Sequence, residues 1–290
     1  MADSRHSIYF NGQIVPPAAA RLLVDDRAVL FGLGFFETFR TSGGRPHHWT
    51  YNRRRLEQAC ATAGITIPAN FLCANTLRLH EVVSQLLHET GLPDAVFRYT
   101  ITAGAEGAPS EFLTVRLLPP AAPAEGICLR VLKLARDNGE WLPRPKSLNY
   151  ANALLGAEEL RRRATAPVDE GLFLSRDGRF VVETPRQNIA WLEGARLCYP
   201  DSSLGAIAGT CLQWLLELGQ AAEPRRAQLG ELLAADAIVV LNSVRGITPV
   251  REVSDAEDRA RLRSFDSHTH PLVAAWRDRW NEALRTTADR

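Results

Sequence analysis

The amino-acid sequence predicts an α+β fold divided into two domains. Residues 1–118 have the alternating apolar pattern of antiparallel strands together with the period of two amphipathic helices. Residues 126–290 carry a second series of strand and helix patterns. Between them, residues 119–125 are rich in proline, which favours a short, stiff linker. We therefore predict an N-terminal domain at 1–118, a linker at 119–125 and a C-terminal domain at 126–290.

The elements of the predicted N-terminal domain follow from turn and stop signals. Asn11-Gly12 lies between two short apolar runs and is the strongest short hairpin signal. Residues 26–34 read as a glycine-bearing loop that leads into a strand at 35–40. Helices are predicted at 50–64, where Gly64 ends the pattern, and at 74–89, before Gly91. Residues 95–103 and 112–118 are strand-like, so this domain should hold an antiparallel sheet.

The elements of the predicted C-terminal domain begin with a strand at 127–134 and a helix that ends near Arg163. Two hairpins are centred on Asp177-Gly178 and Glu193-Gly194. Residues 237–241 form a continuous apolar run, which indicates a buried strand. A last amphipathic helix is expected at 271–284.

Composition limits the classes of function. The chain has 290 residues with 34 basic and 33 acidic side chains, for a net charge of +1. We therefore expect no nucleic-acid or membrane-surface partner, and no apolar run is long enough to span a membrane. The five cysteines are scattered without metal-ligand spacing, so reduced thiols and a cytoplasmic location are expected.

Lys146 is the residue on which the functional interpretation depends. It follows Pro143 and Pro145 and precedes an apolar helical repeat. A single lysine is usually a solvated surface residue. Lys146, however, is one of few lysines in an arginine-rich chain, and an acid at Glu183 and a Gly209-Thr210 helix start follow it.

Three further features could bind an anion or a ligand. The helix at 50–64 carries Arg53, Arg54 and Arg55, which form either a solvated face or a phosphate clamp. Gly209-Thr210 is either a phosphate site at a helix start or a plain helix entry. A polar loop at 242–246 follows the buried strand, where ligand-binding residues often lie. Pyridoxal phosphate needs this set: an amine, an acid for its ring nitrogen and donors for its phosphate.

Together the motifs resemble the class IV aminotransferase family of fold-type IV pyridoxal-phosphate enzymes. The resemblance covers most of the chain, from Asn11 to Val250. It rests on Asp26-Arg27-(x)4-Gly32-x-Gly34-x-Phe36-Glu37-Thr38, Arg55-Leu56 with Gly64-Ile65, Lys146-Ser147-Leu148-Asn149-Tyr150, Glu183-Thr184-(x)3-Asn188, and Asn242-Ser243-Val244-Arg245-Gly246-Ile247-Thr248-Pro249-Val250. It implies two α+β domains with the cofactor in the cleft between them, usually in a homodimer.

The resemblance also implies roles for individual residues. Lys146 forms the Schiff base and shuttles the proton. Glu183 pairs with the pyridine nitrogen, and Asn188 supports that loop. The phosphate is bound by Arg55, by the Gly209-Thr210-Cys211 backbone and by the Ser243 hydroxyl. Four positions depart from the common family residues and affect mainly substrate and support sites: Leu33, Asn52, Ala103 and Leu212.

Two reactions are consistent with this resemblance. The Asn242-Ser243-Val244-Arg245-Gly246 loop is similar to that of 4-amino-4-deoxychorismate lyases, and Arg98 or Arg245 would suit a substrate with two carboxylates. Thr38 is a candidate proton relay, although a packing threonine is the simpler interpretation. The alternative is an aminotransferase for branched-chain or D-amino acids, and a cofactor-free binding protein on the same fold is a distant third possibility. We expect no metal site, because the histidines at 268 and 270 have no supporting cluster.

Overall fold

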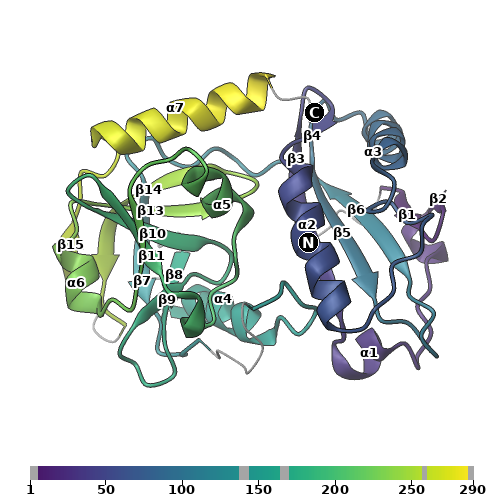
Figure 1. Ribbon diagram of the computed structural model, residues 1–290, viewed down its shortest axis with the longest axis horizontal. Coiled ribbons are helices and arrows are strands. Elements are labelled where there is room, and N and C mark those ends of the chain that lie inside the picture. Colours follow the sequence, from purple (N-terminus) through teal and green to yellow (C-terminus); the bar gives the residue numbers. More distant parts are fainter. Residues whose placement is uncertain (1–5, 137–143, 164–169, 257–259, 287–290) are drawn as a thin grey trace. The chain divides into compact units, whose positions relative to one another are not determined.

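The computed structural model describes residues 6–136, 144–163, 170–256 and 260–286, and its elements are labelled in Figure 1. The chain divides into two compact units. The first comprises Met1–Pro120, Pro145–Asn149 and Ala283–Arg290, and the second comprises Ala121–Arg144 and Tyr150–Glu282. Lys146 thus groups with the first unit, although it lies within the range predicted for the C-terminal domain. The domain boundaries remain a prediction, because compactness alone does not show which part folds independently.

The first unit contains an antiparallel sheet in the order β2-β1-β6-β5-β3-β4. Its strands are β1 (Ile8–Phe10), β2 (Gln13–Val15), β3 (Gly34–Ser42), β4 (Arg45–Pro46), β5 (Val96–Thr102) and β6 (Glu111–Arg116). Its helices are α1 (Arg27–Phe31), α2 (Trp49–Thr62) and α3 (Thr76–Thr90). The hairpin predicted at Asn11-Gly12 is confirmed, because Phe10 pairs with Gln13 across that turn.

The packing of the first unit follows from helical and strand periodicity. On α3, the buried side chains of Leu79, Val83 and Leu86 recur at three- and four-residue spacing, which gives the helix one apolar face. On α2, the ring of Trp49 meets the ring of Phe39 edge-on, with centroids 5.0 Å apart. The α2 helix is therefore fixed against the face of β3 that carries Phe39.

The loop predicted at residues 26–34 is wrong in part, because α1 lies inside it. The Asp26 carboxylate accepts a hydrogen bond from the Ala28 N–H at 2.8 Å and caps the helix start. Gly32 ends the helix with a φ of 68°, in the left-handed region that glycine adopts without strain. A helix of five residues contains too little periodicity to be recognised from its apolar pattern.

The second unit contains a larger mixed sheet in the order β12-β11-β10-β13-β14-β7-β8-β9, with β15 also paired to β14. Its strands are β7 (Ile127–Val131), β8 (Glu170–Leu174), β9 (Val181–Glu183), β10 (Asn188–Glu193), β11 (Arg196–Pro200), β12 (Ala222–Arg225), β13 (Ala237–Asn242), β14 (Gly246–Ser254) and β15 (Arg261–Ser264). Its helices are α4 (Ala151–Arg163), α5 (Thr210–Leu216), α6 (Leu229–Ala234) and most of α7 (Pro271–Thr286).

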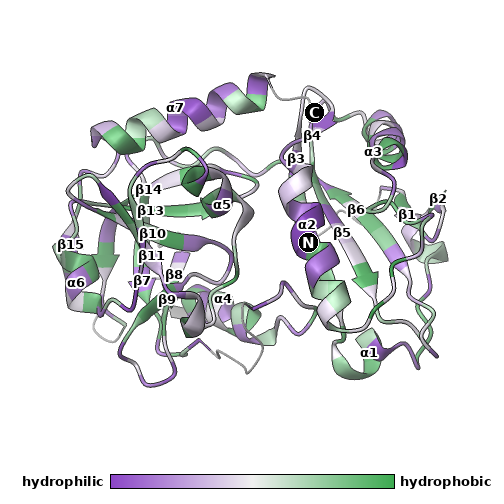
Figure 2. Ribbon diagram, viewed as in Figure 1, coloured by the Kyte–Doolittle hydropathy of each residue, from purple (hydrophilic) through white to green (hydrophobic). Residues whose placement is uncertain are grey.

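The core of the second unit centres on β13, the apolar run at 237–241. Its side chains Ile238 and Val240 are fully buried together with Ile189 and Trp191 of the neighbouring β10. Figure 2 shows α7 alternating between hydrophilic and hydrophobic residues, which marks it as an amphipathic helix. From that helix, the buried Trp280 ring meets Trp214 edge-on, with centroids 5.0 Å apart. Among the described residues, no helix has both the length and the apolar character needed to cross a bilayer.

Candidate active site

Residues 146–148 form a short strand-like segment that pairs with the start of β3. The Phe36 N–H donates to the Lys146 carbonyl at 2.9 Å, and the Leu148 N–H donates to the Gly34 carbonyl at 2.9 Å. Phe35 and Ser147 are antiparallel bridge partners. The backbone from the Lys146 carbonyl to the Leu148 N–H is therefore fixed by hydrogen bonds to a buried strand.

Gly34 is the residue that allows this segment to approach β3. A Cβ atom at position 34 would lie 2.7 Å from the Leu148 Cδ1 atom and 2.7 Å from the Ile101 carbonyl oxygen. Both distances are shorter than real Cβ contacts, so a larger residue would push the Lys146 segment away. The Gly32-x-Gly34 motif therefore has a structural explanation: Gly32 ends α1, and Gly34 makes room for the segment that carries Lys146.

Two cationic side chains of the first unit lie beside the Phe36 ring. The Lys146 Nζ atom lies 4.7 Å from the ring centroid, and the Arg98 guanidinium carbon lies 3.4 Å from it. Arg98 is the cross-strand partner of Thr38, which lies two residues along β3 and therefore on the same face as Phe36. Lys146 and Arg98 thus lie against one aromatic ring, and Thr38 lies opposite Arg98 on the same face of the sheet.

Arg55 is held by Glu37, a buried acid that lies between Phe36 and Thr38 on β3. Its Nε and Nη2 atoms donate to the two carboxylate oxygens of Glu37 at 2.7 and 2.6 Å. The Asn52 amide donates to the same carboxylate at 2.7 Å and to the Thr38 carbonyl at 3.3 Å. This fork orients the Arg55 guanidinium before any ligand is present. The position occupied by Asn52, a departure from the family pattern, contributes to that support.

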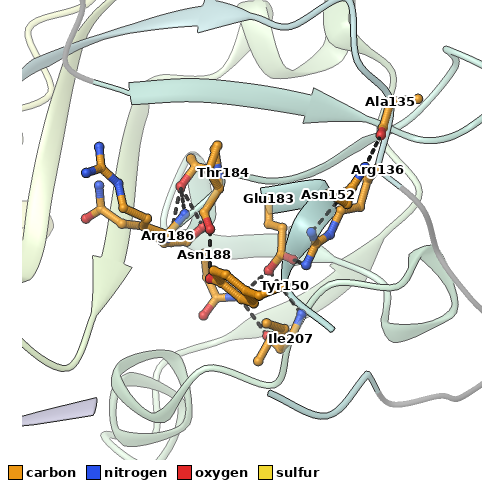
Figure 3. A network of polar contacts seen from close by, with 11 residues as sticks. Ala135, Arg136, Tyr150, Asn152, Glu183, Thr184, Arg186, Asn188 and Ile207 are labelled. Carbon is orange, nitrogen blue, oxygen red and sulfur yellow. Dashed lines mark hydrogen bonds and ion pairs between the residues drawn. The ribbon is translucent and has the colours of Figure 1, made fainter. Parts of the chain in front are cut away.

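Glu183 is a buried carboxylate at the end of β9 in the second unit (Figure 3). Its Oε2 atom accepts hydrogen bonds from the Ile207 N–H at 3.0 Å and from the Asn188 amide at 3.4 Å. Its Oε1 atom lies 2.5 Å from the Arg136 Nη2 atom. A buried carboxylate with this many donors is held in one orientation. Glu183 and Asn188, both predicted from the sequence, are therefore in contact.

Asn188 also explains the glycine at position 209. Its amide donates to the Ile207 carbonyl at 2.7 Å, and a Cβ atom at position 209 would lie 1.6 Å from its Oδ1 atom. Glycine is therefore required there for the close approach of the Asn188 side chain. Thr210 and Cys211 follow in the first turn of α5 and are buried. Burial raises the pKa of the Cys211 thiol, so this side chain packs as a neutral group.

Ser243 and Arg245 lie in the turn between β13 and β14, which Asn242 organises. The Asn242 Oδ1 atom accepts hydrogen bonds from the N–H groups of Val244 and Arg245 at 2.9 and 2.7 Å. Its amide nitrogen donates to the Gln187 side chain at 2.9 Å, in the loop that follows Glu183. Arg245 is exposed and Ser243 is half-buried. The predicted polar loop is thus tied to the loop of the predicted acid.

Two supporting residues, Glu37 and Arg136, were not predicted as parts of the site. The sequence signal for Glu37 is an acid at a strand position that faces the core, among Phe35 and Phe39. Arg136 gives no local signal, because its partner Glu183 is 47 positions away (183 − 136). Among the described residues, no group of three or more His, Cys, Asp or Glu side chains could hold a metal ion.

Comparison with known proteins identifies the family. The family model for amino-transferase class IV matches residues 34–253, a range that includes Arg55, Lys146 and Glu183. The chain belongs to the class IV aminotransferase family. This family member is 28% identical to the aminodeoxychorismate lyase of Bacillus subtilis (strain 168) over 269 residues, 86% of this chain and 87% of that protein.

A second relative and a solved structure extend the comparison. The chain is 25% identical over 259 residues to the bifunctional aminodeoxychorismate lyase / D-amino acid transaminase of Mycobacterium tuberculosis, which covers 82% of this chain and 87% of that protein. The crystal structure of 4-amino-4-deoxychorismate lyase from Pseudomonas aeruginosa is 26% identical, with a TM-score of 0.73 and coverage of 95% of this chain and 98% of that one. The predicted two-domain fold-type IV architecture is confirmed.

Proposed function

We propose that this class IV family member is a pyridoxal-phosphate enzyme that acts as a 4-amino-4-deoxychorismate lyase, releasing pyruvate and forming 4-aminobenzoate. The observation that carries the proposal is the pairing of residues 146–148 with β3, which presents the Lys146 amine beside the Phe36 ring. The names of the Bacillus subtilis relative and of the Pseudomonas aeruginosa structure support the lyase reaction.

The side chains fit the proposed cofactor by the chemistry of their donors and acceptors. When bound, pyridoxal phosphate supplies an electron sink for charge that develops on the substrate carbon. Lys146 would hold it covalently, Glu183 would accept a hydrogen bond from its ring nitrogen, and the pre-oriented Arg55 would bind its phosphate. The remaining proposed contacts are Asn188, the backbone of Gly209, Thr210 and Cys211, and the Ser243 hydroxyl.

The Lys146 amine is proposed to move the proton of the reaction. An uncharged amine can take a proton from a substrate carbon and return it elsewhere. The Phe36 ring centroid lies 4.7 Å from the Nζ atom, so an apolar surface adjoins this amine. The atoms of the substrate are fully accounted for by pyruvate and 4-aminobenzoate, so the lyase reaction needs no second substrate.

We propose that the substrate carboxylates are bound by arginine. Arg98 is the favoured group, because its guanidinium is packed against Phe36, beside the same ring as the Lys146 amine. Arg245 is a second candidate, since it is exposed on the turn that Asn242 organises. Thr38 lies beside Arg98 on the neighbouring strand and is kept as the candidate proton relay.

A class IV aminotransferase, acting on D-amino or branched-chain amino acids with a 2-oxo acid acceptor, is the second candidate function. It is supported by the name of the Mycobacterium tuberculosis relative, which combines lyase and D-amino acid transaminase activities. The Lys146 amine and the Glu183 carboxylate would have the same tasks in both reactions. The difference lies in whether a keto acid is required.

We also propose that the protein is a cytoplasmic homodimer that serves folate biosynthesis through its 4-aminobenzoate product. Association is supported by large apolar side chains that are exposed close together in sequence: Leu23, Val24, Val29, Leu30 and Phe31. The cytoplasm is supported by five free, buried cysteines. Sedimentation velocity of the wild type and of a variant with Phe31→Ser and Val24→Ser would test the dimer.

The decisive experiment combines a spectrum with product analysis. The purified protein should absorb visible light, and aminodeoxychorismate alone should yield pyruvate and 4-aminobenzoate in equal amounts. Lys146→Ala should abolish turnover and the covalent label left by borohydride, whereas Lys133→Ala should retain both, because Lys133 is exposed elsewhere. A requirement for 2-oxoglutarate would establish the aminotransferase instead. A colourless protein that binds aminodeoxychorismate without converting it would establish the cofactor-free alternative.

A further inference from the structure

Arg136 forms a buried ion pair with the predicted acid of the site. Its Nη2 atom lies 2.5 Å from the Glu183 Oε1 atom, and the side chains are only 2% and 4% exposed. Its Nη1 atom donates to the Asn152 Oδ1 atom at 3.1 Å, and its guanidinium lies 5.4 Å from the Phe173 ring centroid. Figure 3 shows Glu183 with Arg136 at one side and Asn188 with Ile207 at the other.

The position of Arg136 is set by groups near the start of α4. The Asn152 amide accepts from the Arg136 guanidinium and also donates to the Ala135 carbonyl at 3.0 Å. Two residues earlier, the Tyr150 hydroxyl donates to the Pro185 carbonyl at 2.8 Å, in the loop after Glu183. Tyr150, just before α4, and Asn152, in its first turn, therefore hold the loop of the acid partner and the arginine, respectively.

Fold stability alone does not account for this pair. Removing two charges from water costs about as much as their attraction returns, so well-packed apolar residues often serve the fold equally well. Glu183, however, is also predicted to pair with the ring nitrogen of the cofactor, and in that pair the proton can lie either on the carboxylate or on the nitrogen. A permanent positive charge beside the Glu183 Oε1 atom influences which of the two groups holds it.

We propose that Arg136 is a positioning residue that keeps the negative charge on Glu183, so that the shared proton lies on the cofactor ring nitrogen. The inference rests on the proposed role of Glu183. The guanidinium touches the carboxylate at 2.5 Å, and any group bound through that carboxylate lies farther from the guanidinium. Its attraction for the carboxylate therefore exceeds its repulsion of a protonated ring. Arginine suits this task because it stays charged when buried.

The test measures the proton on the ring directly. The protein is loaded with pyridoxal phosphate labelled with ¹⁵N in the ring, and the ¹⁵N chemical shift is recorded at neutral pH. In the wild type the shift should be that of a protonated ring. In Arg136→Gln it should move toward that of a neutral pyridine, and Arg136→Lys, which keeps the charge, should restore the wild-type signal.

A matched control separates this role from the loss of an ion pair in general. Arg186 lies in the loop after Glu183 and pairs at 3.2 Å with a different buried acid, Glu170. Arg186→Gln should therefore leave the ring signal unchanged. If Arg136→Gln keeps the protonated-ring signal, the inference is overturned. If Arg136→Gln does not fold, Arg136→Lys decides, because a neutral ring in that variant would overturn it.

A further variant distinguishes failure of this inference from failure of the proposed site. Glu183→Gln removes the acid itself and should give a neutral ring. If Glu183→Gln shifts the signal and Arg136→Gln does not, only the role of Arg136 is refuted. If Glu183→Gln has no effect, the proposed assignment of Glu183 is wrong, and the inference about Arg136 is overturned with it.

Discussion

The fork between Glu37 and Arg55 yields a stability prediction with a worked magnitude. Glu37→Gln keeps the shape of the side chain but removes its charge. The pair is nearly inaccessible to water, with side-chain exposures of 1% for Glu37 and 12% for Arg55. Breaking a buried ion pair by neutralising one partner costs about 3–5 kcal/mol. We expect about 3 kcal/mol, the lower end of that range, because Arg55 retains some access to solvent.

Hydrogen–deuterium exchange of α2 peptides measures this loss locally. A cost of about 3 kcal/mol should speed the exchange of α2 amides that open with the first unit roughly a hundredfold. The control is Glu57→Gln on the same helix, whose pair with Arg53 spans 3.8 Å with side chains 37% and 44% exposed. That exposed pair should contribute less than about 0.5 kcal/mol. Equal exchange in the two variants would refute the reasoning.

Two further predictions concern the first unit. Gly34→Ala should displace the Lys146 segment, because the added Cβ would lie 2.7 Å from the Leu148 Cδ1 atom. The turnover rate should therefore fall strongly, whereas the melting temperature should change little. Glu111 accepts a hydrogen bond from the Tyr99 hydroxyl and is buried, and burial raises the pKa of its carboxyl group. The folded state therefore binds the carboxyl proton of Glu111 more tightly than the unfolded state does. Its contribution to stability is complete below the unfolded pKa and is lost as the pH rises through the higher folded pKa. Thermal unfolding against pH should show this loss in the wild type and not in Glu111→Gln.

Local signals predicted most of the regular structure. The helix expected at 74–89 is α3, the buried strand expected at 237–241 is β13, and the hairpins around Gly178 and Gly194 are present as β8–β9 and β10–β11. The elements β12 and α6 were missed. The β12 strand contains Pro224, which argues against a strand, and α6 has six residues, too few to display a helical period.

The site was predictable only where the residue type itself indicates a chemical role. An isolated lysine, an acid and a polar loop can be recognised from one sequence, and family motifs connect them. The supporting contacts cannot, because each joins residues that are distant in the chain: Glu37 with Arg55, Arg136 with Glu183, and Gly209 with Asn188. A glycine whose purpose is to admit another residue's side chain looks the same in sequence as a glycine in a turn.

The turn after β13 has a consequence for engineering this enzyme class. Asn242 supplies the framework of the turn, and a Cβ at Gly246 would lie 2.2 Å from the Trp280 indole nitrogen. Those two ends are therefore closed to substitution, whereas the side chains of Ser243 and Arg245 take no part in those framework contacts. Because the Ser243 hydroxyl is a proposed phosphate ligand, libraries that randomise position 245 while retaining 242, 243 and 246 would explore new substrates on an intact scaffold.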